Sequence, residues 1–418
     1  MSGELRWFST RGHEGVVKML LERDDINPDQ ADADWGFTPL IWAANHGHEG
    51  VVNLLLERED VNPNATQDMY DCTALSWVAD SGHVGVVKIL LEREDVNPNA
   101  ELPSSSQTPL GWAAENGHVG IVKMLLERKD VNPDHGDTHD DRAPLSWAAG
   151  SGHEGIVKLL LERKDVNPDH ADTEYGKTPL SWAAEKGHEG VVKILLERKD
   201  VNPNQADIKS GRTPLWCAAL YRHGRVVKIL LEQKDVNPNH ADTKYGRAPL
   251  TWAAKEGHEE LVKILLERED ISPNQTDTLY GQTPLSWAAE NGHVGIVKML
   301  LEREDVNPNQ PDTKYGRTPL SWAARNGHVE AVRILLEQED VNPNHADTID
   351  GRTALSWAAE WGHAEVVKML LGREGINPDQ ADTIEGWSPL SWAVENRHQH
   401  VIDILLERWL NLEDMIEL

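Results

Sequence analysis

The sequence predicts an all-α fold, an elongated solenoid of about twelve stacked helix-turn-helix repeats of 35 residues with projecting hairpin-like loops. The first observation is a histidine that recurs every 35 residues from His13 to His398 and directly follows Gly in ten of the twelve copies. The second is that six of the twelve copies carry the same two helix boundaries, Thr-Pro and Val-Asn-Pro. A fixed period of roughly 20–50 residues is the signature of a repeat solenoid. Because solenoids present surface and rarely enclose a pocket, this fold favours a binding function.

The first helix of each unit is predicted to begin at Thr-Pro, as in the copy that runs from Gly316 to His328. The Thr318 side chain can cap the free N–H groups, and Pro319 takes the first helical position, where its missing N–H costs nothing. A short apolar stretch follows, and Asn-Gly ends the helix. Ala143 and Ala248 replace the capping Thr in two copies, which should cost about 1 kcal/mol each.

The second helix of each unit is predicted from its apolar periodicity. In the fourth copy, Val119, Ile121, Val122 and Leu125 fall on one broad face. Val-Asn-Pro then ends the helix, since Pro keeps the preceding residue out of helical geometry. A loop with a Tyr-Gly or Asp-Gly turn leads to the next Thr-Pro.

The motif Gly-x-Thr-Pro-Leu-x-x-Ala-Ala-x-x-Gly-His, followed by Val-Val-x-x-Leu-Leu, strongly resembles the ankyrin repeat over nearly the whole chain, in the style of the long arrays of filamentous fungi. Two departures stand out. Glu-Asp or Lys-Asp follows the second helix where the family usually has Gly-Ala, and the unit has 35 residues instead of about 33. The resemblance implies a scaffold for protein–protein interaction, a structural histidine that bonds the neighbouring turn, and an apolar core residue at the position of Trp322.

The repeats are expected to form one solenoid over residues 1–410, with an incomplete first copy at 1–32 and a capping tail at 411–418. The terminal repeat must cover its open face, and the tail carries the apolar residues Leu412, Met415 and Ile416. The truncated first copy leaves open that the chain is one arm of a longer protein.

Composition restricts the partners. The net charge is −29, from 70 acidic and 41 basic residues, so binding to nucleic acid or an anionic membrane surface is disfavoured. No apolar run is long enough for membrane insertion. Cys72 and Cys217 lie in distant copies and cannot bridge, which fits a reducing compartment. We therefore expect a monomer that is cytoplasmic or nuclear and not secreted.

Two patterns suggest metal chemistry. The recurring histidines are about 10 Å apart and cannot converge on one ion. The loop from His135 to Asp141 holds two imidazoles and three carboxylates, so it leaves a metal site open, although flexible acidic loops look like this by chance. No catalytic motif is found. We assign no metal, no cofactor and no catalysis.

Tryptophan recurs at one position of the first helix in eleven copies, and we expect these indoles to fill the core. They are Trp7, Trp42, Trp77, Trp112, Trp147, Trp182, Trp252, Trp287, Trp322, Trp357 and Trp392. In the seventh copy the order is reversed to Trp216-Cys217, which is expected to push the indole outward and leave the thiol in the core.

Positions that vary between copies are the candidates for partner binding, because the framework positions must hold the fold. By resemblance they line the concave groove and the tips of the finger loops. Tyr, Trp and Arg are enriched at interface hot spots. The varying positions include four equivalent tyrosines, Tyr175, Tyr245, Tyr280 and Tyr315, and beside them a basic column of Lys177, Arg212, Arg247, Arg317 and Arg352. The predicted partner-binding residues are Tyr175, Lys177, Arg212, Trp216, Tyr221, Lys244, Tyr245, Arg247, Tyr280, Lys314, Tyr315, Arg317, Arg325, Arg352 and Trp361.

The leading hypothesis is a scaffold that binds another protein, through an extended acidic segment, along the sixth to eleventh copies. The alternative is a small-molecule or catalytic groove that uses outward aromatics and carboxylates, namely Trp216, Tyr221, Glu256, Glu290 and Trp361. A third interpretation is that each tyrosine only packs its finger on the neighbouring finger and that the arginines only add solubility.

Overall fold

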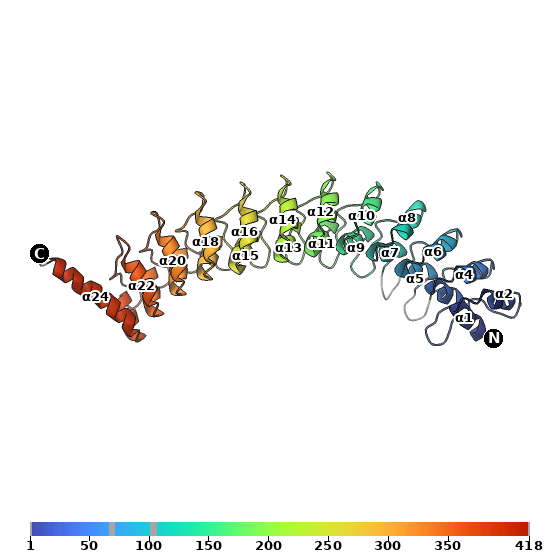
Figure 1. Cartoon of the computed structure of the whole chain (residues 1–418), viewed down its shortest axis with the longest axis horizontal. Coiled ribbons are helices and arrows are strands. Elements are labelled where there is room, and N and C mark those ends of the chain that lie inside the picture. The colour runs from blue at the N-terminus through green and yellow to red at the C-terminus, as the bar shows by residue number, and fades with distance from the viewer. Residues whose placement is uncertain (1, 67–71, 101–106, 417–418) are drawn as a thin grey trace. The chain divides into compact units, whose positions relative to one another are not determined.

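The computed structural model describes residues 2–66, 72–100 and 107–416. Over these residues it contains 24 α-helices and no strand, which confirms an all-α fold built of tandem repeats of about 35 residues. The chain divides into two compact units, Met1–Lys209 and Ser210–Leu418, and each unit is a row of helix pairs (Figure 1). Residues 67–71 and 101–106, in the loops before the first helices of the third and fourth copies, lie outside the described residues.

The helices of the first unit are α1 (Ser2–Thr10), α2 (Glu14–Leu21), α3 (Pro39–Asn45), α4 (Glu49–Leu56), α5 (Ala74–Ser81), α6 (Val84–Leu91), α7 (Pro109–Glu115), α8 (Val119–Glu127), α9 (Pro144–Ser151), α10 (Glu154–Leu161), α11 (Pro179–Lys186) and α12 (Glu189–Leu196). Those of the second unit are α13 (Pro214–Leu220), α14 (Gly224–Leu231), α15 (Pro249–Glu256), α16 (Glu259–Leu266), α17 (Pro284–Glu290), α18 (Val294–Leu301), α19 (Pro319–Arg325), α20 (Val329–Leu336), α21 (Ala354–Glu360), α22 (Ala364–Leu371), α23 (Pro389–Glu395) and α24 (Gln399–Ile416).

Within each unit, first helices pack against the first helices of neighbouring repeats, and second helices pack against second helices. The core between them is apolar: Leu320, Val332 and Leu335 of the tenth copy are at most 1% exposed. The described part of the chain has no helix long and apolar enough to cross a membrane. The tail beyond 410 begins inside α24, and its predicted capping role stays a prediction.

The helix starts follow the Thr-Pro prediction. The Thr318 hydroxyl accepts a hydrogen bond from the backbone N–H of Ser321 at 3.3 Å, with Pro319 at the first position of α19. Ala143 and Ala248 provide no side-chain cap for α9 and α15, as expected.

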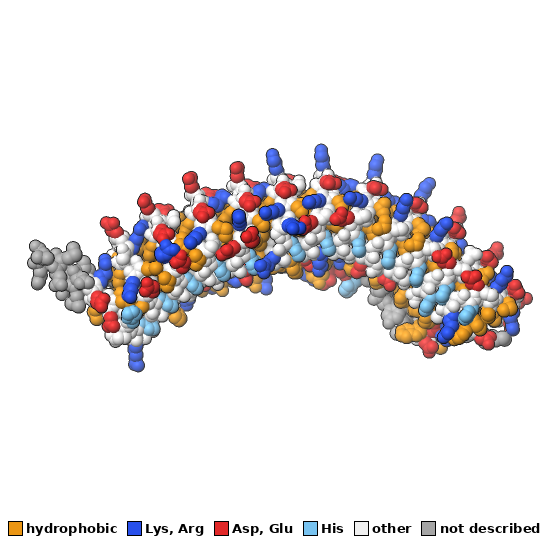
Figure 2. Space-filling model, viewed as in Figure 1, with side chains coloured by type: hydrophobic (Ala, Val, Ile, Leu, Met, Phe, Trp, Pro, Cys, Tyr) orange, Lys and Arg blue, Asp and Glu red, His pale blue; other side chains and the backbone are white. Residues whose placement is uncertain are grey.

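The recurring histidines tie neighbouring repeats together, which confirms the structural role implied by the resemblance. His328 Nε2 lies 2.9 Å from the carbonyl oxygen of Glu290, one repeat earlier, and must donate to it because a carbonyl only accepts. Equivalent contacts are made by His48, His83, His118, His153, His188, His293, His363 and His398. Figure 2 shows histidine side chains in pale blue on the surface.

Glycine before the histidine is required by two constraints. Gly292 has φ 70°, a left-handed conformation that disfavours side chains. A Cβ atom at Gly292 would also lie 2.6 Å from Nδ1 of His328 in the next repeat. The dipeptide therefore provides the close approach that lets each histidine reach its carbonyl.

The seventh copy breaks this rule. Arg222 replaces the glycine and keeps a left-handed φ of 62°. Among the hydrogen bonds of the second unit, none joins His258 to the carbonyl of Leu220, the contact that the repeat pattern requires. A hollow of about 310 Å³ lies at this junction, lined by Arg222, Gly224, His258 and Ile264 among others. A side chain at position 222 therefore disturbs the histidine of the following repeat.

A second tie between repeats comes from the charged ends of the second helices. Arg303 donates through Nε and Nη2 to Asp305 at 2.9 and 2.8 Å, and through Nη1 to the carbonyl of Leu266 in the preceding copy at 3.1 Å. The sequence signal for this clamp is Arg-x-Asp, which occurs at equivalent positions in eight of the twelve copies.

The loop after Val-Asn-Pro adds a ladder of side-chain amides. Asn99 accepts from the backbone N–H of Asn132 at 3.0 Å and donates to the carbonyl of Asp130 at 2.6 Å. Asp169 occupies the equivalent position in another copy and accepts from Asn202 at 2.8 Å, but its second carboxylate oxygen is buried without a hydrogen bond. Burial raises the pKa of Asp169.

Candidate partner-binding face

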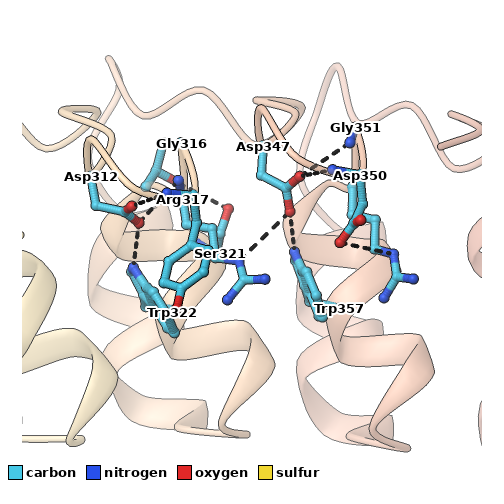
Figure 3. A network of polar contacts seen from close by, with 12 residues as sticks. Asp312, Gly316, Arg317, Ser321, Trp322, Asp347, Asp350, Gly351 and Trp357 are labelled. Carbon is cyan, nitrogen blue, oxygen red and sulfur yellow. Dashed lines mark hydrogen bonds and ion pairs between the residues drawn. The ribbon is translucent and has the colours of Figure 1, made fainter. Parts of the chain in front are cut away.

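In most of the finger loops that the structure describes, one aspartate organises the turn. In the tenth copy, Asp312 Oδ1 accepts from the backbone N–H groups of Lys314 and Tyr315 at 3.0 and 2.6 Å. Its Oδ2 accepts from Trp322 Nε1 at 3.0 Å, and its own N–H donates to the carbonyl of Arg317 (Figure 3). The aspartate thereby closes the finger turn and holds the indole of the following helix.

In six copies, the finger aspartate accepts a hydrogen bond from the indole of the tryptophan ten residues later. This contact indicates the role of the tryptophans. The pairs are Asp32–Trp42, Asp172–Trp182, Asp277–Trp287, Asp312–Trp322, Asp347–Trp357 and Asp382–Trp392. Core filling is confirmed for four of the eleven predicted indoles, which are 5–8% exposed: Trp182, Trp287, Trp322 and Trp357. Six others are half-buried, and the prediction is wrong for Trp7, which is 45% exposed in the incomplete first copy.

The expectation that Trp216 points outward is wrong. Its side chain is 1% exposed, and Nε1 donates to the carbonyl of Arg247 in the next repeat at 2.8 Å. The ring centroid lies 5.7 Å from that of Trp252. Cys217 is also buried, at 2% exposed, as expected. The reversal directs the indole toward the next finger, where the backbone carbonyl satisfies its N–H, so Trp216 cannot contact a partner.

Two arginines of the predicted basic column are also buried, which corrects their expected place on the surface. Arg247 and Arg317 are 7% and 8% exposed. Each approaches the aspartate of the next finger, with Nε 3.5 Å from Asp277 Oδ2 and 3.7 Å from Asp347 Oδ2 respectively. Figure 3 shows Arg317 between its own finger and Asp347. The next finger's carboxylate draws these guanidinium groups inward, so they join repeats.

Other members of the column are paired within their own repeat, at a spacing of eight residues. Lys177 Nζ lies 2.5 Å from Glu185 Oε2, and Arg352 Nη1 lies 2.8 Å from Glu360 Oε2. Arg212 follows the other pattern, with Nη2 3.9 Å from Asp242 of the next finger. Most of the basic column therefore faces carboxylates of the chain itself.

The finger tyrosines are half-buried and pack within the row of fingers. Tyr280 and Tyr315 stack with ring centroids 6.5 Å apart, and each meets its own tryptophan edge-on at 5.8 and 5.9 Å. Tyr175 meets Trp182 in the same way at 6.2 Å. Lys244 lies over Tyr245 at 4.8 Å. Tyrosine packing of the fingers, the third interpretation above, is thus part of the structure.

A hollow of about 490 Å³ lies on the first-helix and finger side of the ninth and tenth copies. Its lining is Tyr280, Gln282, Trp287, Glu290, Tyr315, Arg317, Trp322 and Arg325. Gln282 Nε2 donates to Glu290 Oε2 at 2.5 Å. Burial raises the pKa of Glu290, opposed by this hydrogen bond and by the charge of Arg325.

Four of the predicted partner-binding residues are well exposed, in finger loops or at the ends of first helices. Lys244 and Lys314 lie in finger loops. Tyr221 and Trp361, at the C-terminal ends of α13 and α21, are 51% and 52% exposed. Arg325 lies beside Trp361, with its guanidinium carbon 5.1 Å from the ring centroid. We call the set Tyr280, Tyr315, Arg325 and Trp361 the aromatic–arginine face.

The residues of the alternative small-molecule groove do not share one cavity. Trp216 is buried, and of the other four only Glu290 lines the hollow described above. Tyr221, Glu256 and Trp361 end the first helices of the seventh, eighth and eleventh copies.

The loop that left a metal site open brings together only part of its predicted ligand set. Ligand atoms of His139 and Asp140 lie within 4.8 Å of each other and of Glu174 from the next finger. Asp137 is the organising aspartate of its finger and accepts from two backbone N–H groups. Glu174 is also bonded to Lys209 Nζ at 3.0 Å.

These features define a helical repeat protein whose first helices and fingers carry the sequence differences between copies. The family described as ankyrin repeats (3 copies) matches residues 5–67, 59–137, 128–207, 201–277, 270–347 and 339–414. The chain therefore belongs to the ankyrin-repeat family, whose repeats are generally protein–protein interaction modules. Among curated proteins, no match is found.

Proposed function

We propose that the chain is a non-catalytic scaffold that binds an extended, acidic segment of a partner protein across the aromatic–arginine face of the second unit. The observation that carries this proposal is the hollow of the ninth and tenth copies. Its lining combines tyrosine, tryptophan and arginine, the residues most enriched at interface hot spots. Trp361 extends this lining with an indole that is 52% exposed.

The acidic character of the partner follows from the local charge. The chain as a whole carries −29, and the exposed second-helix residues would attract basic partners. The aromatic–arginine face differs, because Arg325 has no carboxylate within 4.0 Å among the described residues. An acidic segment complements this face and is repelled by most of the remaining surface.

The test is selection of a displayed library of random dodecapeptides on the full chain, followed by affinity measurements with variants. The combined change Tyr280→Ser, Arg325→Gln and Trp361→Ser removes the face without emptying the core. We expect the selected peptides to be rich in Asp and Glu and to bind this variant at least about tenfold more weakly.

The matched control removes three exposed cations from the second helices of the same copies, Lys298→Gln, Arg333→Gln and Lys368→Gln. This control should leave the affinity within about twofold at physiological ionic strength, because distant charges are screened. Equal loss in both variants would assign binding to general charge, and undiminished binding in the face variant would refute the proposal.

A further inference from the structure

The tenth copy departs from its neighbours at one position of the aromatic–arginine face. In the ninth and eleventh copies, Glu290 and Glu360 end the first helix and accept from the residue eight positions earlier. In the tenth copy the same position is Arg325. A carboxylate is therefore replaced by a cation at the centre of this face.

We infer that Arg325 forms a subsite for one carboxylate side chain, Asp or Glu, of the bound segment. The inference rests on the proposed function and specifies which group of the partner this site recognises. Arg325 Nε is buried without a hydrogen-bond acceptor, and Nη1 makes one long contact, 3.5 Å, to Asn326 Oδ1. A guanidinium group prefers a planar, bidentate partner such as a carboxylate.

Neighbouring cations already have carboxylates. Arg317 approaches Asp347, Lys255 Nζ lies 2.8 Å from Glu256, and Arg352 binds Glu360. Burial lowers the pKa of Arg317, and the charge of Arg325 lowers it further. A bound carboxylate would relieve this repulsion between two arginines.

The surroundings favour a single negative charge. The guanidinium carbon of Arg325 lies 5.9, 5.6 and 5.1 Å from the ring centroids of Trp322, Trp357 and Trp361, a distance at which cation–π attraction keeps the group in place. The Glu290 carboxyl group lines the same hollow. One unpaired cation beside an acidic group matches a monoanion better than a doubly charged phosphate.

The probe is acetyl-glutamate amide, a single capped residue, titrated into the full-length chain and followed by the NMR signal of the Trp361 indole N–H. We expect a saturable shift with an affinity in the millimolar range, as for one charge-assisted contact. Acetyl-glutamine amide, which has the same shape without the charge, should bind at least about tenfold more weakly. Acetyl-phosphoserine amide should bind no more tightly than the glutamate probe.

The variants separate this subsite from general charge. Arg325→Gln should abolish the saturable shift, Arg325→Lys should retain part of it, and Lys255→Gln in the eighth copy should leave it unchanged. Equal shifts with the glutamine probe, or an undiminished shift in Arg325→Gln, would overturn the inference. Tighter binding of phosphoserine would replace the carboxylate by a phosphate. Loss of peptide binding to the whole face, with the glutamate shift intact, would instead count against the proposed function.

Discussion

The side chain at position 222 is the clearest local conflict in the molecule. Arg222 holds a left-handed φ of 62° in a place where a Cβ atom in other copies would meet the next histidine ring. Arg397, at φ 58°, makes the same replacement in the twelfth copy, and the described residues after it include no histidine at the recurring position. Arg222 should therefore lower the free energy of unfolding more than Arg397 does, by the hydrogen bond that His258 loses.

We predict that Arg222→Gly raises the free energy of unfolding of the chain by about 2 kcal/mol. About 1 kcal/mol comes from relief of the left-handed conformation and about 1 kcal/mol from a new hydrogen bond between His258 and the Leu220 carbonyl. Arg397→Gly is the control and should give only the first part. Urea unfolding of the two variants measures the difference, and equal gains would show that the histidine bond is not restored.

The same variant should change the titration of His258. Burial lowers the pKa of His258, and the charge of Arg222 lowers it further. Because this pKa lies below its value in the unfolded chain, the unfolded state binds more protons. The group's contribution to stability is present above the unfolded value and is lost as the pH falls through the lower, folded value. Arg222→Gly removes a positive neighbour, so the His258 pKa measured by NMR should rise. An unchanged or lower pKa would contradict the proposed contact.

A third prediction concerns the core indoles. Trp287→Ala should cost about 3–5 kcal/mol, because it empties a buried site and leaves Asp277 Oδ2 without its donor. Trp7→Ala, at an indole that is 45% exposed, is the control and should cost less than about 1 kcal/mol. A loss below about 1 kcal/mol for Trp287 in chemical unfolding would place these indoles outside the core.

At the scale of the element, the loop ladder contains carboxylates where amides fit better. Asn99 both accepts and donates in this ladder, whereas Asp169 can only accept when it is ionised. Burial raises the Asp169 pKa, so its protonated form is favoured in the fold, and the stability from protonation is lost as the pH rises through the folded value.

Asp169→Asn should therefore raise the free energy of unfolding by about 0.5–1 kcal/mol at pH 7. The gain is small because the side chain is only half-buried and solvent screens its charge. The gain should shrink as the pH falls and the wild-type carboxyl group becomes protonated. Asp379→Asn is the control, since Asp379 is exposed and its carboxylate accepts no hydrogen bond from a later repeat among the described residues. Thermal unfolding at several pH values would contradict the argument if both variants behaved alike.

The elements themselves could be predicted from the sequence because each boundary has a local cause. Thr-Pro, Asn-Gly and Val-Asn-Pro act within one repeat and do not depend on tertiary contacts. The side-chain directions of the fingers could not be predicted in this way. Arg247 and Arg317 turn inward because the carboxylate that receives each of them lies thirty residues later, in the next finger.

Trp216 shows the same limit of sequence reasoning. A helical wheel places it one step away from the usual indole, which suggests an outward ring. The adjacent repeat provides the carbonyl of Arg247 and the ring of Trp252, and these contacts bury it. By contrast, the exposure of Trp361 could be predicted from the sequence by comparing the twelve copies. Trp361 caps the C-terminal end of α21 and is 52% exposed.

At the scale of the whole molecule, regular positions hold the repeats together, and the proposed partner contacts fall at irregular positions. The recurring histidines, the Arg-x-Asp clamps and the Asp–Trp contacts all join or close repeats. Most cations of the fingers are engaged in the same way. Arg325 and Trp361 depart from this pattern, so we propose that recognition takes place there.

The most direct test of this central claim is hydrogen–deuterium exchange on the full chain with and without a selected acidic dodecapeptide. We predict that the bound peptide slows amide exchange in α17, α19 and α21 and in the finger loops that precede them. Exchange in α18, α20 and α22 should not change. Protection confined to the second helices, or spread evenly over all copies, would contradict this prediction.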